Sequence, residues 1–242
     1  MLSTPWFLKA ILNNVASTVA TPDSHTFKPS KEIEPFTMEI GMDLPVEDQV
    51  RTMLGCVCRS LAIRGSIGEN VRCTADVMFG KEGAVDTTFD ATDAVSDTDG
   101  FIPYTFEHGS VELPGGTVLA EVQSIDLNMA SNAELLYGHG SPTAVNARRG
   151  ITEITGRVNM TMRDNTAWGY VNARSDILSL NLKYTNGMNG DAERSILFAL
   201  TGISIAEHSI GTLESGEAIF QDFDFQAKNI TATAKNNTAA VP

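Results

Sequence analysis

The chain has 242 residues, with 30 acidic and 17 basic side chains and a formal net charge of -13. This acidity argues against a protein that binds the outside of nucleic acids, because neutralising phosphates takes clustered Lys and Arg. It also argues against anchoring on an anionic membrane surface. Two interpretations stay open: the charge keeps the protein soluble, or it belongs to a wall that repels DNA sliding past it.

The N-terminal part begins with a helix signal. The spacing of apolar residues predicts a short amphipathic helix over residues 5–15, with Thr4 as N-cap and Pro5 at the first helical position. Beyond this helix we expect a polar connector, a strand and a helical turn, at residues 21–30, 35–41 and 46–55 respectively.

A β-hairpin is the next expected element. Residues 57–67 and 71–79 each alternate apolar and polar side chains, and Gly68-Glu69 between them supplies a turn. The polar side of this hairpin carries Arg64, Arg72, Thr74 and Asp76.

Residues 82–103 break the alternation and predict a long, solvated, acidic loop without a basic residue. Loops of this length in compact domains tend to be functional or disordered, so this segment is a candidate contact with another subunit. Its acidic residues are Glu82, Asp86, Asp90, Asp93, Asp97 and Asp99.

The second half of the chain continues mainly as strands, separated by turns. A polar loop is expected at 131–149, a helix at 165–174 and a loose polar tail from residue 235. The clearest alternation, at 153–163, has Glu153, Arg157 and Asn159 on its wet face. The remaining strands are predicted at 104–113, 118–129, 177–184, 195–205 and 218–234. Roughly eight to ten strands and two short helices predict a mainly β fold, a sandwich or barrel.

No constellation of residues indicates catalysis. The four histidines are scattered, and neither a nucleophile motif nor a phosphate loop occurs. Asp222 and Asp224 share one strand face, which is typical of a solvated surface. A carbohydrate-binding or hydrolytic sandwich would need an aromatic platform or a carboxylate pair in a cleft. We therefore expect no enzyme and no cofactor.

Three cysteines, Cys56, Cys58 and Cys73, form neither a disulfide framework nor a four-ligand zinc site. They are expected to be small buried side chains in a reducing compartment, with no metal bound. No segment has the roughly 18 apolar residues that span a bilayer, and no secretory signal precedes the helix. The sequence thus predicts a protein made in the cytoplasm without a membrane anchor.

Several segments, taken in order, resemble the tail tube proteins of tailed prokaryotic viruses, of the siphovirus type. The opening PWFLKAIL (5–12), SHTFKPS (24–30) and PFTMEIGMD (35–43) are similar to the start of such proteins. LGCVCRSLAIRGSIG (54–68) resembles their first core hairpin. EITGRVNMTMRD (153–164), a helix and LSLNLKYTNG (178–187) resemble their strand, helix and strand unit. GE (216–217) followed by QDFDFQ (221–226) resembles their closing strand.

The resemblance implies a structural virion protein with one domain over residues 1–242. It would have an N-terminal arm at 1–34, the acidic loop at 82–103 and a flexible tail at 235–242. Tail tube proteins form hexameric rings that stack into a hollow tube, with sheets of neighbouring subunits completing one β-barrel around the lumen. The loops and terminal arms then reach adjacent rings.

The implied partners are further copies of the chain, other tail proteins (tape measure, terminator, and baseplate or tip) and viral DNA that passes without specific binding. The implied location is the virion tail, assembled in the host cytoplasm. The candidate lumen or inter-subunit residues are Arg64, Arg72, Thr74, Asp76, Glu153, Arg157 and Asn159, and the acidic loop is the candidate inter-ring contact. Since Arg on a lumen wall would attract phosphate, some of these residues are alternatively expected to pair with acids between subunits. Another self-assembling virion β-module, a tail terminator or decoration protein, is the alternative function.

Overall fold

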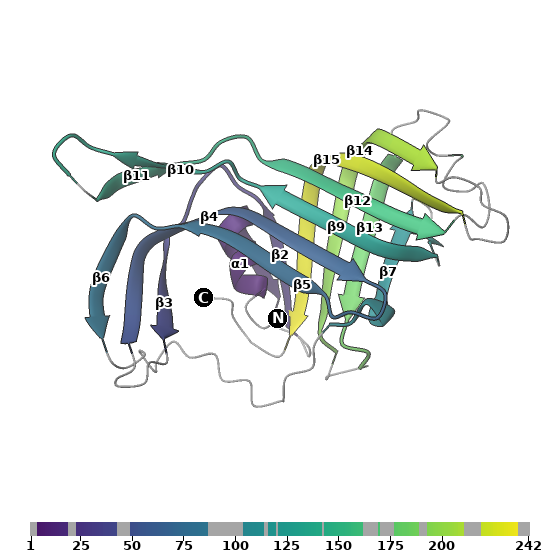
Figure 1. Cartoon of the computed structure of the whole chain (residues 1–242), viewed down its shortest axis with the longest axis horizontal. Coiled ribbons are helices and arrows are strands. Elements are labelled where there is room, and N and C mark those ends of the chain that lie inside the picture. Colours follow the sequence, from purple (N-terminus) through teal and green to yellow (C-terminus); the bar gives the residue numbers. More distant parts are fainter. Residues whose placement is uncertain are drawn as a thin grey trace.

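The protein is mainly β, with a large antiparallel sheet (Figure 1). The computed structural model describes residues 4–18, 23–42, 49–86, 104–113, 116–119, 121–141, 143–161, 169, 177–188, 193–210 and 219–236. Within these ranges there is one α-helix, and the mainly β fold class expected from the sequence is confirmed.

The described elements follow one another as a helix, fifteen strands and one 3-10 turn. In chain order they are α1 (Thr4–Leu12), β1 (Asn13–Thr18), β2 (Asp23–Pro29), β3 (Phe36–Met42), β4 (Gln49–Ser66), β5 (Arg72–Met78), β6 (Lys81–Asp86), η1 (Phe106–His108), β7 (Gly109–Leu113), β8 (Thr117–Val118), β9 (Val122–Ala130), β10 (Glu134–Tyr137), β11 (Ala144–Arg148), β12 (Glu153–Thr161), β13 (Ile177–Thr185), β14 (Ser195–Ile210) and β15 (Phe220–Asn236).

One continuous sheet folds back on itself to enclose the core. Its strand order is β3-β4-β9-β12-β15-β14-β13-β7-β8, with β5 and β6 added to β4, and with β2 joining β15 to β1. The long strands β14 and β15 belong to both layers. The first half of β15 pairs with β12, and its second half pairs with β2. In Figure 1, the ribbons of β4, β9 and β12 accordingly cross those of β13 to β15.

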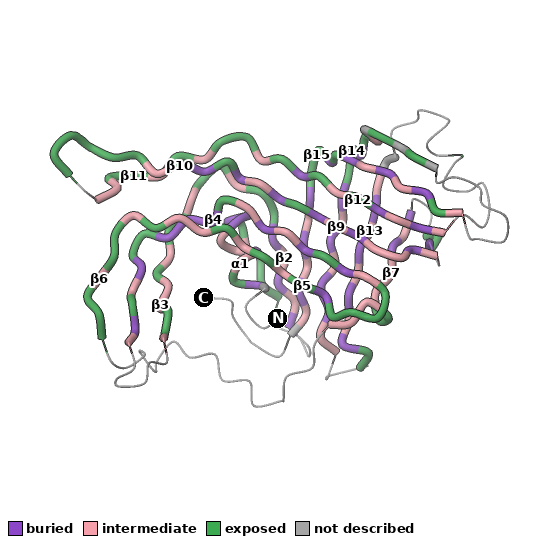
Figure 2. The backbone as a smooth tube through the Cα atoms, viewed as in Figure 1, coloured by how far each residue is buried: buried purple, intermediate pink, exposed green. Residues whose placement is uncertain are grey.

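The core lies between these two layers. Leu61 of β4 and Val158 of β12 come from one layer, and Leu182 of β13 and Phe198 of β14 come from the other. Strands β2, β9 and β12 bury every second residue over much of their length, as expected for a sheet with one solvent-exposed face. Figure 2 shows this alternation along β9 and β12.

The layers approach closely at Gly65 of β4. A Cβ added there would lie 2.8 Å from the hydroxyl oxygen of Tyr184, which is 2 % exposed. Only a residue without a side chain fits at this approach. Burial raises the pKa of the Tyr184 phenol, because its charged form would lose hydration.

Two arms project from the body (Figure 1). In the first arm, called the extension below, β3 and β6 flank the first half of β4 on opposite sides. The second arm is the β10–β11 hairpin, which forms its own two-stranded sheet. Figure 2 shows mostly exposed and intermediate residues on both arms.

The described residues of the N-terminal segment pack into the body, and the arm expected at 1–34 stays a prediction. Leu8, Ile11 and Leu12 of α1 and Phe27 of β2 are 0 % exposed. The helix ends three residues before the predicted end, because Asn13 takes a left-handed φ of 62°. The expected polar connector at 21–30 contains β2, whose alternate residues face the core.

Three other sequence interpretations need correction. The helical turn predicted at 46–55 is replaced, from Gln49 on, by β4, which pairs with strands on both sides. The polar loop expected at 131–149 contains the β10–β11 hairpin. Lys235 belongs to β15 and is no part of a loose tail. The helix predicted at 165–174 lies outside the described residues, apart from Gly169.

Candidate assembly surface

A single polar face extends over β5, β4, β9, β12 and β15. The strand register brings all seven residues predicted for this surface onto it. Three lie on β5 and three on β12, while Arg64 lies on β4, in register with both Arg72 of β5 and Asp126 of β9. Most of these side chains are exposed because the opposite side of each strand faces the core. The residues are Arg64, Arg72, Thr74, Asp76, Glu153, Arg157 and Asn159.

Charged residues form one row across this face. Register pairs connect Arg72 to Arg64, Arg64 to Asp126, Asp126 to Arg157, and Arg157 to Asp224. Arg64 Nε lies 3.2 Å from an Asp126 carboxylate oxygen. Arg157 lies 3.0 Å from Asp222 and 3.7 Å from Asp224. Sequence patterns alone missed Asp126 as a partner, because only the register brings it beside the two arginines.

The ion pairs of this row neutralise charge on the polar face and add little to the stability of the fold. The hydrogen bond with Asp222 and the charges of Asp222, Asp224 and Glu207 raise the pKa of the Arg157 guanidinium. Asn159 also donates from Nδ2 to Asp222. Exposed ion pairs of this kind contribute little to stability, because water and salt screen them. Their effect is that two arginines on the face carry carboxylate neighbours and attract other anions less.

The same sheet leaves backbone groups unpaired at its margins. Within the described part of the chain, β5 pairs only with β4, β3 only with β4, and β6 only with β4. An open strand edge is a template for pairing with another chain. A polar face between open edges suits a protein that continues its sheet into a neighbouring copy.

The comparison with protein families agrees with this geometry. Residues 2–227 match the family described as phage tail tube protein, which is nearly the whole chain. The chain belongs to the phage tail tube protein family. The comparison with curated proteins finds no match.

Membership in this family confirms the resemblance seen in the sequence and assigns a general function. A tail tube protein is a structural component of the virion tail, and it assembles with itself and with other tail proteins. The family is structural and is not an enzyme family. No helix among the described residues has the length and apolar character needed to cross a membrane.

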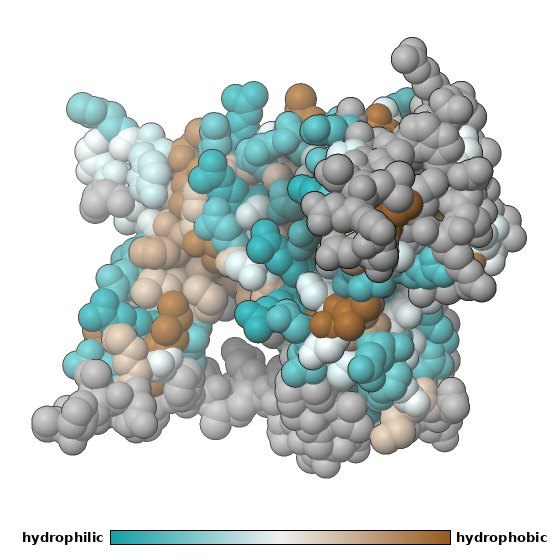
Figure 3. Space-filling view, turned by 45° about the vertical axis from the view of Figure 1, so that its right-hand side comes forward, coloured by the Kyte–Doolittle hydropathy of each residue, from teal (hydrophilic) through white to brown (hydrophobic). Residues whose placement is uncertain are grey.

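The two arms of this tail tube protein carry exposed apolar side chains. Figure 3 shows hydrophobic residues on the extension, beside the hollow that separates it from the body. The exposed apolar residues on or next to the arms are Ile40, Leu54, Phe79, Val85, Leu136, Tyr137, Val145 and Ile151. Apolar side chains concentrated on projecting elements mark a surface that another protein covers.

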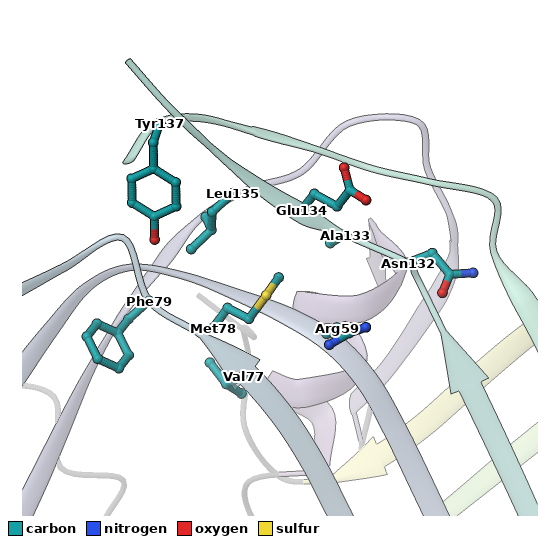
Figure 4. Close-up of a pocket in the computed structure, with 9 residues that line it drawn as sticks. All are labelled: Arg59, Val77, Met78, Phe79, Asn132, Ala133, Glu134, Leu135 and Tyr137. Carbon is teal, nitrogen blue, oxygen red and sulfur yellow. The ribbon is translucent and has the colours of Figure 1, made fainter. Parts of the chain in front are cut away.

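A groove of about 620 Å³ lies where the hairpin leaves the body (Figure 4). Tyr137 and Leu135 of β10 point toward the end of β5, where Met78 lies next to Phe79. Arg59 and Glu134 supply charged groups at the margin. The groove therefore joins the exposed apolar surface of the hairpin to that of the body.

The first residues of the predicted acidic loop belong to a strand. Glu82 and Asp86 lie in β6, and Glu82 forms an ion pair of 3.3 Å with Arg51 on β4. Alternation is weak in β6, and its partner strand lies about 30 residues earlier, so the local sequence gave no strand signal. The remaining candidates of this loop, which are Asp90, Asp93, Asp97 and Asp99, lie outside the described residues.

The cysteines have the character of core residues. Cys56 and Cys58 are buried, and desolvation raises both thiol pKa values, that of Cys58 to about 12. Cys73 is half-buried and packs against the core. In the ranges that the structure describes, no group of three or more His, Cys, Asp or Glu residues could hold a metal ion.

Proposed function

We propose that the protein forms hexameric rings that stack into the hollow tail tube, through which viral DNA passes into the host cell. The observation that carries this proposal is the polar face that crosses five strands and has an open edge at β5. Ring closure would supply an identical neighbour for that edge, and cyclic rotation lets such a head-to-tail contact close.

In this proposal the polar face lines the lumen. The lining residues would be Arg64, Arg72, Thr74, Asp76, Glu153, Arg157 and Asn159. DNA would pass without specific binding, because Arg64 and Arg157 are already paired with Asp126, Asp222 and Asp224. A net acidic protein repels the remaining phosphate charge. This local neutralisation weakens the attraction that arginines on a lumen wall would otherwise have for DNA phosphates.

The arms are proposed to join adjacent rings. Their exposed apolar residues would be covered by a ring above or below, with Tyr137 and Val145 at the hairpin and Val85 at the extension. The acidic segment that includes Glu82 and Asp86 stays part of this proposal, together with Asp90, Asp93, Asp97 and Asp99. Further proposed partners are the tape measure, the terminator, and the baseplate or tip, with assembly in the host cytoplasm.

Electron microscopy of the purified full chain tests this proposal. After concentration and negative staining, we expect annular particles with six-fold symmetry and hollow filaments built from them. Sedimentation of the same samples should show assembly that increases with protein concentration. A chain that stays monomeric at every concentration and salt condition would contradict the proposal. Rings that never stack would favour the terminator alternative.

A further inference from the structure

The extension joins the body where β4 exchanges one set of neighbouring strands for another. Residues 49–54 of β4 pair with β3 and β6, whereas from Val57 on the strand pairs with β5 and β9. Three of these four pairings have a register shift at or opposite residues 51–60 of β4. Such shifts bend a strand and increase its twist. The chain therefore bends between the body and the extension.

Two glycines face each other at this bend. Gly55 of β4 has a left-handed φ of 64°. The amide of Gly80, which lies between β5 and β6, donates to the Leu54 carbonyl oxygen at 3.0 Å. A Cβ added to Gly55 would lie 3.9 Å from the Gly80 nitrogen. Since neither position carries a side chain, the backbone can change direction here without a steric clash, as hinges require.

The hydrophobic core of the body ends at the same level. The residues that β4 contributes to it all follow Gly55, and they are Cys58, Leu61 and Ile63. Val50 and Met53, which precede Gly55, are also buried, but they are not part of this core. Phe36, the register partner of Cys56 at the bend, packs partly against it. A rotation of the extension about the bend therefore leaves the core of the body packed.

The β10–β11 hairpin reaches from the body to this bend, and both arms project on the same side (Figure 1). At the root of the hairpin, Ser131 donates from Oγ to the Cys58 carbonyl oxygen at 2.8 Å, on the body side of the bend. Farther along, the Ala144 amide donates to the Gly80 carbonyl oxygen at 3.2 Å. A Cβ added to Gly80 would lie 3.1 Å from the Cβ of Ala144. The hairpin is thus fixed in the body and contacts the bend directly.

An open groove lies beside this contact. Tyr137 is the register partner of Ala144, and with Leu135 it points toward Met78 and Phe79 (Figure 4). The groove between these side chains has a volume of about 620 Å³. A single main-chain hydrogen bond next to an open groove holds two elements weakly, so this contact can open and close.

We infer that the extension swings on a hinge at Gly55 and Gly80, and that the β10–β11 hairpin is a brace that limits this swing through the hydrogen bond from Ala144 to Gly80. The inference rests on the proposed function in one respect. If the arms join adjacent rings, the brace sets the angle at which the extension meets the next ring. A contact that shifts the hairpin then also releases the extension.

A disulfide in place of the brace is the direct test. Gly80→Cys and Ala144→Cys put two thiols where the Cβ separation is a few tenths of an ångström below the range of about 3.5–4.5 Å found in disulfides. Oxidation should form this bond in the folded chain, and reduction should break it again in the same protein. Peptide mapping identifies the cross-link between positions 80 and 144 and distinguishes it from links to the native thiols.

Single-molecule energy transfer measures the swing. Dyes are attached through noncanonical amino acids at Val85 on β6 and at Asn128 on β9, which are both exposed. The oxidised two-cysteine variant should give a distribution of transfer efficiency about half as wide as that of the wild type, because the brace no longer opens. Ala144→Pro lacks the donor amide and should give a distribution about twice as wide. Asn146→Ser, an exposed change on the same hairpin, should keep the width of the wild type.

The outcomes separate the hinge from the tube, because single chains are measured far below the concentration of assembly. If either the disulfide or Ala144→Pro leaves the wild-type width unaltered, the braced hinge is wrong. A disulfide that does not form in the folded chain also overturns it, and this holds even if the proline variant fails to fold. Wild-type protein that forms neither rings nor tubes contradicts the proposed function and leaves the hinge untouched.

Discussion

The aromatic ring of Phe225 fills the space that a side chain at Gly156 would occupy. The two residues are register partners on β15 and β12. A Cβ added to Gly156 would lie 2.7 Å from Cε1 of Phe225 and 2.8 Å from the carbonyl oxygen of Asp126. Phe225 is 2 % exposed, so its ring cannot move into solvent.

Replacing this glycine should therefore weaken the fold. Gly156→Ala is expected to lower the free energy of unfolding by about 1–3 kcal/mol, measured by urea denaturation, because the core is overpacked. Thr155→Ala, on the exposed face of the same strand, should cost less than about 1 kcal/mol. In the Phe225→Leu background the glycine substitution should cost less than it does alone. A cost that is unchanged there would contradict the contact.

Alkaline conditions should destabilise the folded protein. Between pH 9 and about 12 the unfolded chain loses the Cys58 thiol proton while the folded chain keeps it, because burial raises this pKa to about 12. The folded state then binds more protons, so the free energy of unfolding falls as pH rises, by about 1.4 kcal/mol per pH unit for one group. Tyr104, with a pKa raised to about 12, adds to the loss above pH 10.

A variant separates the contribution of Cys58 from general alkaline effects. Thermal unfolding of Cys58→Ala, followed between pH 8 and pH 10, should show a shallower loss of stability than the wild type. Parallel curves for the two proteins would show that Cys58 does not titrate as described.

Arg149 is expected to tie the β10–β11 hairpin to α1. Its Nη2 donates to the carbonyl oxygen of Ile11 in the last turn of the helix, where a positive charge is favourable. Arg149→Met keeps the apolar stem and should lower the free energy of unfolding by about 1–2 kcal/mol. Arg148→Met, on the exposed neighbouring position, should change it by less than about 0.5 kcal/mol.

The Arg149 guanidinium also carries a desolvation cost. Nε and Nη1 of its guanidinium are buried without a hydrogen-bond partner in the described structure, and desolvation lowers its pKa. If Arg149→Met were more stable than the wild type, desolvation would outweigh the bond to α1, and the proposed tie would be refuted.

The Tyr137 side chain of the hairpin should matter for assembly and not for the stability of the single chain. Tyr137 is 60 % exposed on β10. Tyr137→Ser is expected to raise the concentration needed for tube formation about tenfold, measured by sedimentation, because an aromatic anchor between copies is lost. Thermal unfolding of the unassembled chain should stay the same. Asn146→Ser, an exposed polar change on the same hairpin, should assemble normally, and equal assembly of both variants would remove the hairpin from the ring contact.

The alternation of apolar and polar residues predicted the strands whose position depends on local sequence. The strand expected at 153–163 is found at Glu153–Thr161, and the hairpin around Gly68 is found with Arg64 opposite Arg72. Alternation also placed the polar residues of these strands on one exposed face. This worked because side chains on a strand alternate strictly between core and solvent.

Other features depend on which strands become neighbours, and a single sequence does not contain that information locally. Asp126 is a partner of Arg64 only because β9 lies beside β4, more than fifty residues away in the chain. The strand β6 and the hairpin β10–β11 are short and have no buried face, so an alternation between core and solvent does not mark them as strands. In the described structure β13 stops pairing with β14 at Ile203. The periodicity of the sequence does not predict where this pairing stops.

The central claim is that identical copies close this sheet into a ring whose inner wall is the polar face. The most direct measurement is a helical reconstruction of the assembled protein by cryo-electron microscopy. We expect six copies per ring, with Arg64, Asp126 and Arg157 facing the bore. A reconstruction in which these three side chains face the outer surface, or are covered by another subunit, would contradict the claim.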